Sequence, residues 1–170
     1  MFSLRHFSAA LVLAILPSVH AQQEKLPPAD LAIVEKQWPT AKKTSTCLRY
    51  VILKEGEGPT AKPGDLLSVL YRGAILNGKV FDEAEDPAHP FTFRLGRNQV
   101  IQGWDQGLGF LRRGGKMLLI IPSELGYGTR GSGPTIPPNS TLVFEIDLVD
   151  LKPEAPLPLA EPPPVKAKKS

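Results

Sequence analysis

The feature that most constrains the fold lies between Thr46 and Leu151, where short apolar runs alternate with clusters of Gly, Pro, Asn and Asp. Runs of this length, bounded by turn residues, are typical of β-strands joined by tight turns. Asn77-Gly78 is a strong signal for such a turn. The expected strands are Cys47–Leu53, Leu66–Leu76, Lys79–Asp82, Phe91–Leu95, Met117–Ile121 and Thr141–Val149.

One segment of this region departs from the strand period. Between Val100 and Leu111 the apolar residues recur at helical spacing, and Gly114-Gly115 follows that segment. Several consecutive strands with one short helix predict an α+β domain built on an antiparallel sheet. The region is long enough to bury a core of its own.

The two flanking segments have a different composition. Gln22–Ser45 is polar and contains three prolines, which predicts a spacer or short arm, with Asp30 as N-cap of a helix running to Trp38. Lys152–Ser170 is rich in proline and ends in lysines, which is typical of an extended, disordered tail. The expected organisation is an arm at 22–45, a domain at 46–152 and a tail at 153–170.

The first 21 residues have the pattern of a secretory signal. Arg5 supplies the positive charge, Phe7–Leu16 is a short apolar run, and Val19 and Ala21 are small residues at the expected cleavage positions. The apolar run is too short to cross a bilayer, which takes about 20 residues. We therefore expect an exported protein, periplasmic or secreted, that has no membrane anchor.

Charge and composition exclude several classes of function. A formal net charge of +3 without a clustered basic face does not favour a nucleic-acid partner. Beyond the signal, the only histidine is His89 and the only cysteine is Cys47, so no zinc site and no cofactor are expected. His89 reads as a loop residue. Cys47 reads as a half-buried thiol at the start of a strand, and pairing between chains is the alternative.

Two glycine patterns resemble nucleotide-binding motifs only superficially. Gly126–Gly131 has the spacing of a dinucleotide fingerprint, but prolines follow where a helix must begin. Gly114–Lys116 lacks the other residues of a phosphate loop. A chain with no nucleophile pair, metal site or phosphate loop can still catalyse rotation about an X-Pro amide, because an apolar pocket suffices for that reaction.

Several short segments together carry a family signature. They are Tyr71–Gly73, Gly78–Asp82, Phe91–Gly96, Val100–Leu108, Gly114–Lys116, Ile121-Pro122, Gly126–Gly128 and Ile136–Phe144. In this order and at this spacing they resemble the FK506-binding protein (FKBP) family of peptidyl-prolyl cis/trans isomerases. The resemblance covers about residues 46–151. It implies an antiparallel, curved β-sheet wrapped around one short α-helix.

The resemblance also implies a site. Residues matching the catalytic positions of the family are Tyr71, Phe81, Asp82, Tyr127 and Phe144, and those matching its binding positions are Phe91, Val100, Ile101, Trp104 and Ile136. In the family Trp104 would be the floor under a prolyl ring, and the Ile101 N–H and Tyr127 hydroxyl would donate to ligand carbonyls. Asp82 has two readings, a polar contact in the pocket or a cap on a backbone N–H. Leu125 and Ser132 stand at rim positions where the family often has aromatic residues or histidine.

The function implied is isomerisation of X-Pro bonds in exported proteins, assisting their folding. The expected partners are proline-containing polypeptides and FK506- or rapamycin-type ligands. Residues 22–45 are too few for the long dimerisation helices of some exported relatives, so a monomer is expected. The alternatives are a non-catalytic chaperone or binding module of the same fold, and a surface interaction protein that acts through its tail.

Overall fold

The computed structural model describes residues 24–76 and 78–155. The expected signal segment, Asn77 and most of the expected tail lie outside the described residues. The elements are α1 (Pro28–Gln37), β1 (Lys42–Lys43), β2 (Arg49–Lys54), β3 (Glu57–Thr60), β4 (Leu66–Ile75), β5 (Val80–Ala84), β6 (Phe91–Arg94), α2 (Gln102–Gly107), η1 (Leu108–Phe110), β7 (Arg112–Arg113), β8 (Lys116–Ile121), η2 (Ser123–Leu125) and β9 (Leu142–Lys152).

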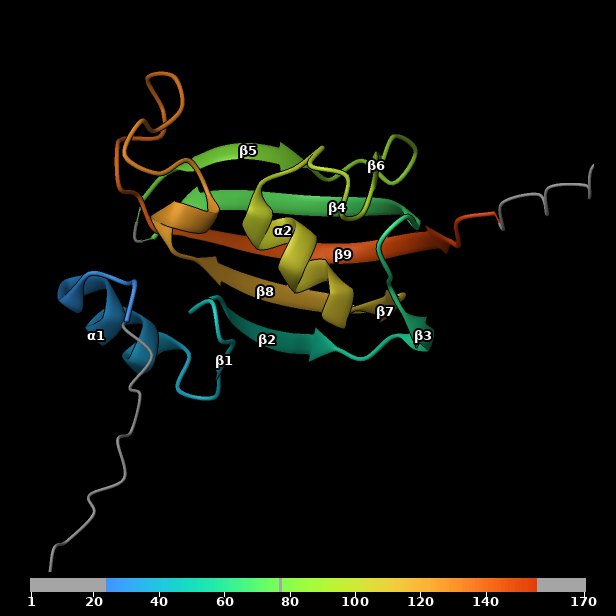
Figure 1. Cartoon of the computed structure of the whole chain (residues 1–170), viewed down its shortest axis with the longest axis horizontal. Coiled ribbons are helices and arrows are strands. Elements are labelled where there is room, and N and C mark those ends of the chain that lie inside the picture. Colours follow the sequence, from blue (N-terminus) through green and yellow to red (C-terminus); the bar gives the residue numbers. More distant parts are fainter. Residues whose placement is uncertain (1–23, 77, 156–170) are drawn as a thin grey trace, which may run out of the picture.

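The main sheet has seven strands and is antiparallel throughout. Its order is β1-β2-β8-β9-β4-β5, and β6 pairs with β4 beyond the end of β5. The long strands β4 and β9 lie side by side at its centre, as Figure 1 shows. This arrangement confirms the expected α+β class with an antiparallel sheet and a short helix.

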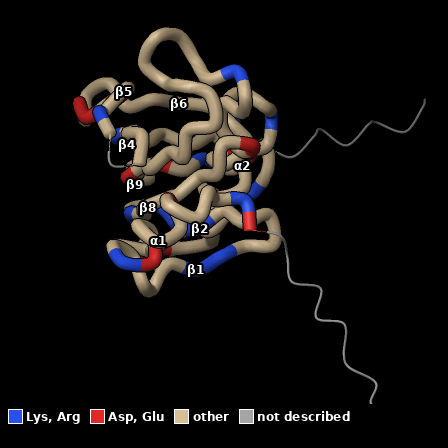
Figure 2. Tube along the Cα trace, turned by 90° about the vertical axis from the view of Figure 1, so that its left-hand side faces the viewer, with Lys and Arg blue, Asp and Glu red and all other residues tan. Residues whose placement is uncertain are grey.

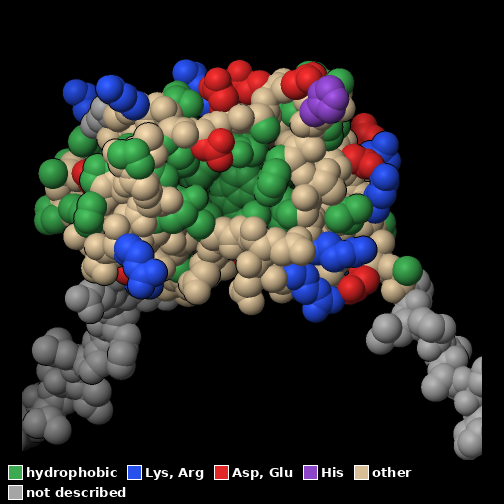
Figure 3. Space-filling model, turned by 90° about the horizontal axis from the view of Figure 1, so that it is seen from above, with side chains coloured by type: hydrophobic (Ala, Val, Ile, Leu, Met, Phe, Trp, Pro, Cys, Tyr) green, Lys and Arg blue, Asp and Glu red, His purple; other side chains and the backbone are tan. Residues whose placement is uncertain are grey.

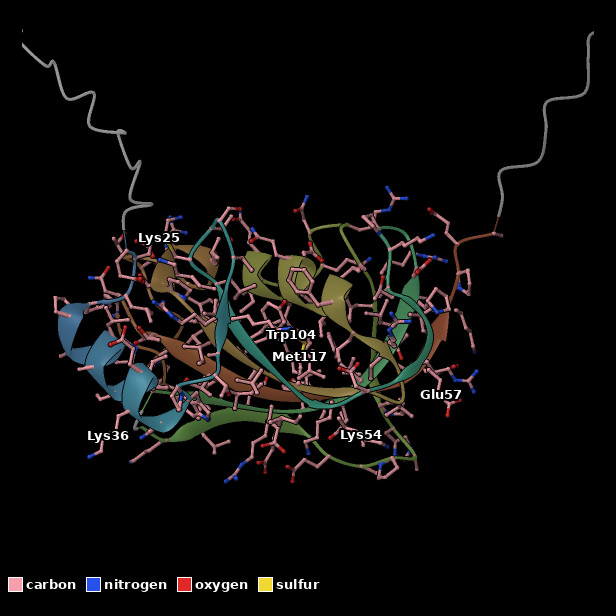
Figure 4. All side chains as sticks on the ribbon, turned by 90° about the horizontal axis from the view of Figure 1, so that it is seen from below. Lys25, Lys36, Lys54, Glu57, Trp104 and Met117 are labelled. Carbon is pink, nitrogen blue, oxygen red and sulfur yellow. The ribbon has the colours of Figure 1, made fainter. Side chains whose placement is uncertain are left out.

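The inner face of the sheet holds the main core. Alternate residues of the central strands point to this face, where they pack against α2 and η1. In Figure 1, α2 crosses in front of β9 and β8. In Figure 4, Trp104 of α2 and Met117 of β8 both lie in the interior of the molecule, and both belong to this core.

Two glycines allow α2 to approach the sheet closely. A Cβ atom on Gly103 would lie 2.5 Å from Cγ2 of Ile121, and one on Gly107 would lie 2.6 Å from Cδ2 of Leu119. Both separations are shorter than real Cβ contacts allow. The helix therefore needs glycine on the side that faces β8, and this contact sets the position of Trp104 between the two glycines.

The outer face of the sheet is partly covered by α1. Leu26 and Val34 are buried against Leu118 and Ile120 of β8, and Trp38 packs beside them. Figure 2 shows α1 and α2 on different sides of the sheet. Because β8 is covered on both faces, all but the first of its residues are buried, which agrees with the continuous apolar run in the sequence.

Polar contacts fasten the arm to the sheet as well. Two guanidinium nitrogens of Arg49 donate to the carboxylate of Glu24, at 3.0 and 2.7 Å. The hydroxyl of Thr141 donates to Oδ2 of Asp30 at 2.6 Å. The sequence suggested a spacer or a short arm here, and in the structure residues 24–41 form an arm that packs on the sheet and covers β8.

The helix of the arm begins earlier than expected. Pro27 is the N-cap residue, prolines occupy its start, and Asp30 lies inside the first turn. The prediction of Asp30 as N-cap is therefore wrong. The carboxylate still lies near the positive end of the helix dipole, which is favourable.

Two further details differ from the sequence-based expectation. Cys47 is fully buried rather than half-buried, and it lies in a turn before β2 with a φ of 68°. Residues Glu57–Thr60, which lie between two of the expected strands, form β3, which pairs with β7 as a separate two-stranded sheet. Its sequence, Glu-Gly-Pro-Thr, has no alternation of apolar and polar residues, and the register of its pairing with β7 is irregular.

None of the helices within residues 24–76 and 78–155 has the length and apolar character needed to span a membrane.

Candidate functional site

An apolar pocket of about 160 Å³ opens between the β4–β5 end of the sheet and the start of α2. Figure 3 shows the face of the molecule on which this pocket opens, with hydrophobic side chains gathered in a hollow at its middle. The lining residues come from most parts of the chain: Tyr71, Phe81, Asp82, Phe91, Gln99, Val100, Ile101, Trp104, Tyr127 and Phe144.

The indole of Trp104 is the centre of an aromatic cluster. It meets Tyr71 edge-on at a centroid distance of 5.0 Å and Phe144 at 5.3 Å. Phe91 lies at 6.2 Å in a similar T-shaped contact. Edge-to-face contacts of this kind orient the rings with respect to one another and add to the energy of burial. The cluster therefore forms a stiff apolar floor and walls.

Gly73 makes room for two of these walls. It lies directly opposite Phe144 in the pairing of β4 with β9, and opposite Asp82 in the pairing with β5. A Cβ atom on Gly73 would lie 2.4 Å from Cε1 of Phe144 and 3.1 Å from Cζ of Phe81. Those two rings stack edge to face across this position. The pocket can therefore have this shape only if residue 73 has no side chain.

Polar groups lie at the edge of the pocket. The hydroxyl of Tyr71 donates to Oδ2 of Asp82 at 2.7 Å. Burial raises the pKa of the Tyr71 hydroxyl, and the hydrogen bond to Asp82 raises it further. Burial also raises the pKa of the Tyr127 hydroxyl, with a further contribution from the Asp82 charge. Both hydroxyls therefore keep their protons at neutral pH and remain hydrogen-bond donors.

Ile101 occupies the N-cap position of α2. Its carbonyl accepts hydrogen bonds from the N–H groups of Trp104 and Asp105. The N–H of an N-cap residue has no acceptor within its own helix, so that of Ile101 is available to a ligand. Nearby, the indole Nε1 of Trp104 is the one buried side-chain nitrogen or oxygen without a hydrogen-bond partner among the described residues.

The loop that carries Tyr127 is closed by backbone hydrogen bonds. Gly128 N donates to Ser123 O at 2.7 Å, Gly131 N to Tyr127 O at 3.1 Å, and Asn139 N to Gly128 O at 2.9 Å. Positive φ angles at Gly128 and Gly131 permit these turns. No helix follows the glycines of this loop in the described chain, which agrees with reading the pattern as turns.

Nine of the ten residues singled out in the sequence meet in this pocket. Ile136 does not line it; its side chain is buried in the core and its backbone pairs with that of Ser132. The observed partner of the Asp82 side chain is another side chain, Tyr71, so the reading as a backbone cap has no support among the described residues. Leu125, expected at the rim, is buried in the core.

Gln99 is a lining residue that sequence reasoning did not single out. Its Oε1 accepts a hydrogen bond from the backbone N–H of Arg94 at 2.8 Å. Its neighbour Val100 was recognised only through the family pattern. A polar residue in a loop has no periodicity that would reveal which way it faces, so no signal in the sequence could have identified it.

His89 has a partner that the sequence did not reveal. Its Nδ1 lies 2.7 Å from Oδ2 of Asp86, three residues earlier in the same loop. The His89 side chain is 84% exposed and does not line the pocket, so it remains a loop residue.

Comparison with known proteins assigns the family. Residues 58–149 match the model of the FKBP-type peptidyl-prolyl cis-trans isomerase family. The chain is 50% identical over 97 residues to an FK506-binding protein of Neisseria meningitidis, covering 57% of this chain and 89% of that protein. It is 46% identical over 112 residues to the FKBP-type peptidyl-prolyl cis-trans isomerase FkpA of Escherichia coli, covering 66% of this chain and 40% of FkpA. The chain belongs to the FKBP-type family.

Solved structures agree with this assignment. The crystal structure of FkpA from Escherichia coli superposes with a TM-score of 0.66 at 40% identity, covering 75% of this chain and 60% of that one. The structure of AtFKBP13 gives a TM-score of 0.60, also at 40% identity, and covers 65% of this chain and 97% of that one. The region matched to FkpA in sequence is less than half of the length of that relative.

Proposed function

We propose that the chain is a peptidyl-prolyl cis/trans isomerase that acts on X-Pro bonds of polypeptides. The observation that carries this proposal is the pocket in which Trp104, four further aromatic walls and two protonated hydroxyls converge. The family assignment supports the same activity. The sheet, α2 and the hydrogen-bonded loop after η2 position these groups.

The chemistry follows from the nature of the amide bond. Rotation about it crosses a barrier of about 18–20 kcal/mol, because the twisted state loses amide resonance. The twisted amide is less polar than the planar one, so a pocket with few water molecules favours it relative to solution. No proton transfer and no covalent bond are required in this step.

We assign roles to the pocket residues on this basis. The prolyl ring would lie on Trp104, enclosed by Tyr71, Phe91 and Phe144. The Ile101 N–H and the Tyr127 hydroxyl would bind the carbonyl oxygens on either side of the rotating bond. Ile136, which matched a family binding position, would act only through the core, because it is buried away from the lining.

We also propose a location, substrates and ligands for the protein. The signal-like segment 1–21 favours export to the periplasm or the outside of the cell, with proline-containing exported polypeptides as substrates. Ligands of the FK506 and rapamycin type would occupy the same pocket. We propose a monomer, and a domain whose limits are near 46 and 152, with α1 packed on it.

A protease-coupled assay with an Xaa-Pro peptide, in the presence and absence of FK506, tests the proposal. We expect catalysis that FK506 abolishes. The rival function, a binding module or chaperone of the same fold, predicts FK506 binding in a direct titration without any acceleration of isomerisation. Absence of both acceleration and binding in a folded sample would contradict both functions.

A further inference from the structure

The described chain ends beside the loop that leads into the pocket. Nη2 of Arg97 lies 2.9 and 3.1 Å from the two carboxylate oxygens of Glu154. The backbone N–H of Glu154 donates to Oδ1 of Asp65 at 3.2 Å. These contacts place Glu154, just after β9, against the segment that precedes Val100.

The loop that carries Arg97 is hydrogen-bonded to α2. The N–H groups of Gly96 and Asn98 donate to the carboxylate of Asp105 on α2, at 2.8 and 3.3 Å. Consecutive Cα atoms are about 3.8 Å apart, so the Cα of Arg97 lies within about 11 Å of that of Val100, a pocket residue. The loop and α2 therefore hold Glu154 near one edge of the site.

The residues that follow Glu154 have the chemistry of a substrate for this pocket. Residues 155–170 contain five prolines, among them one in Leu157-Pro158 and a run at 162–164, and then three lysines. A proline-rich chain extends by about 3.1 Å per residue, so Pro162, eight residues after Glu154, can reach as far as about 25 Å. Length therefore does not prevent these prolines from entering the pocket.

Charge favours the same placement. Asp82 of β5 lines the pocket, and Asp86 in the turn after β5 lies beside His89, whereas the side chain of Glu83 pairs with Arg72. In Figure 3 acidic side chains gather along the upper edge of the hollow, and Lys and Arg side chains lie both beside them and below the hollow. The three lysines come after the prolines, so prolines in the pocket would bring the lysines to the acidic edge.

We infer that residues 155–170 are an intramolecular ligand of the chain's own pocket and compete there with X-Pro substrates. This inference rests on the proposed function, because competition with X-Pro substrates requires that the pocket bind them. A short tether gives an effective concentration in the millimolar range, so even a weak proline ligand would occupy the pocket for part of the time. The acidic edge and the lysines strengthen this occupancy at low ionic strength.

Kinetics of the full chain and of a chain that lacks residues 156–170 test the competition. We expect the deletion to lower KM by about two- to fivefold without a change in kcat, because a competing ligand is removed. A full-length variant with alanine in place of all five prolines keeps length and charge and should behave like the deletion. Equal KM values for all three chains would overturn the inference.

A second measurement separates this inference from the proposed function. The indole N–H resonance of Trp104 reports occupancy of the pocket, and it is assigned with the variant Trp38→Phe, which removes the other indole. We expect its chemical shift to differ between the full chain and both tail variants, independently of protein concentration. The same shift in all three chains would overturn the inference even if the enzyme is active.

The outcomes remain distinguishable. A tail-dependent shift in a chain without isomerase activity would support the intramolecular ligand while contradicting the proposed function. A difference that grows with protein concentration would mean that the segment binds the pocket of another copy, which contradicts the intramolecular form.

Discussion

The hydroxyl of Tyr71 on β4 and the carboxylate of Asp82 on β5 are joined by a hydrogen bond of 2.7 Å at the edge of the pocket. The two strands are neighbours, but these residues are not direct partners in the register, since Tyr71 lies opposite Ala84. The bond therefore runs diagonally and holds the carboxylate beside the aromatic cluster, where its charge also acts on Tyr127.

The first prediction concerns this pair. Asp82→Ala should lower kcat/KM by about tenfold, which corresponds to one hydrogen bond to a charged group. Tyr71→Phe keeps the ring contact with Trp104 and should cost less. Both are measured in the Xaa-Pro peptide assay after circular dichroism has shown that the variants are folded. Wild-type kcat/KM in folded Asp82→Ala would contradict a role for the carboxylate.

The second prediction concerns the space at position 73. Gly73→Ala places a methyl group 2.4 Å from Phe144, so the ring must move and the pocket must change shape. We expect the free energy of unfolding to fall by about 1–3 kcal/mol, the usual cost of overpacking. We also expect the protein that remains folded to lose activity, because the pocket has changed shape. Gly109→Ala is the matched control, because its nearest neighbour would lie at 3.9 Å. Similar melting temperatures and activities for both variants would refute the argument.

The third prediction concerns the arm. Leu26→Ala should lower the free energy of unfolding by about 2–4 kcal/mol, since it leaves a cavity between the arm and β8. Lys36→Ala on the exposed side of α1 should change it little. Urea unfolding of both variants measures the difference. If Leu26→Ala were as stable as the wild type, the arm would not be packed on the sheet.

The fourth prediction concerns the pH dependence of stability. The hydrogen bond from Arg49 lowers the pKa of Glu24 from 4.5 to about 2. A lowered acid pKa stabilises the fold above the unfolded-state pKa, and the contribution is lost as pH falls from about 4.5 to about 2. Glu24→Gln should therefore cost about 1 kcal/mol at pH 7, after allowance for solvent screening, and almost nothing near pH 2.

Urea unfolding of Glu24→Gln and of the wild type at both pH values checks this expectation. Glu57→Gln, on the exposed strand β3, is the control for removal of a carboxylate without this partner. A stability difference between Glu24→Gln and the wild type that stays constant from pH 7 to pH 2 would contradict the assignment.

The fifth prediction concerns the mechanism. Because burial and Asp82 raise the pKa of the Tyr127 hydroxyl, that donor stays protonated, and kcat should be level from about pH 6 to 8. Cys47 is buried outside the pocket lining, so folded Cys47→Ser should be active. A steep pH profile together with inactive, folded Cys47→Ser would indicate a covalent route instead.

Much of the fold was accessible from local patterns. The alternation in β9 and the helical spacing around Trp104 predicted their elements, because each pattern reflects a single buried face. The apolar run Met117–Ile121 predicted the strand β8, but the prediction did not include its burial on both faces or the element that covers the second face. That cover is α1, about 80 residues earlier in the chain, and no local pattern links the two.

The sequence by itself indicated six of the nine strands of the described chain and the short helix, since periodicity is a local property, and its resemblance to the FKBP family indicated nine of the ten lining residues. The tertiary structure decided which residues line the pocket. Gln99 enters the lining while Ile136 and Leu125 point into the core. It also decided that the segment around α1 is part of the fold. Both outcomes depend on contacts between residues far apart in sequence, whose geometry exists only once the strands have paired.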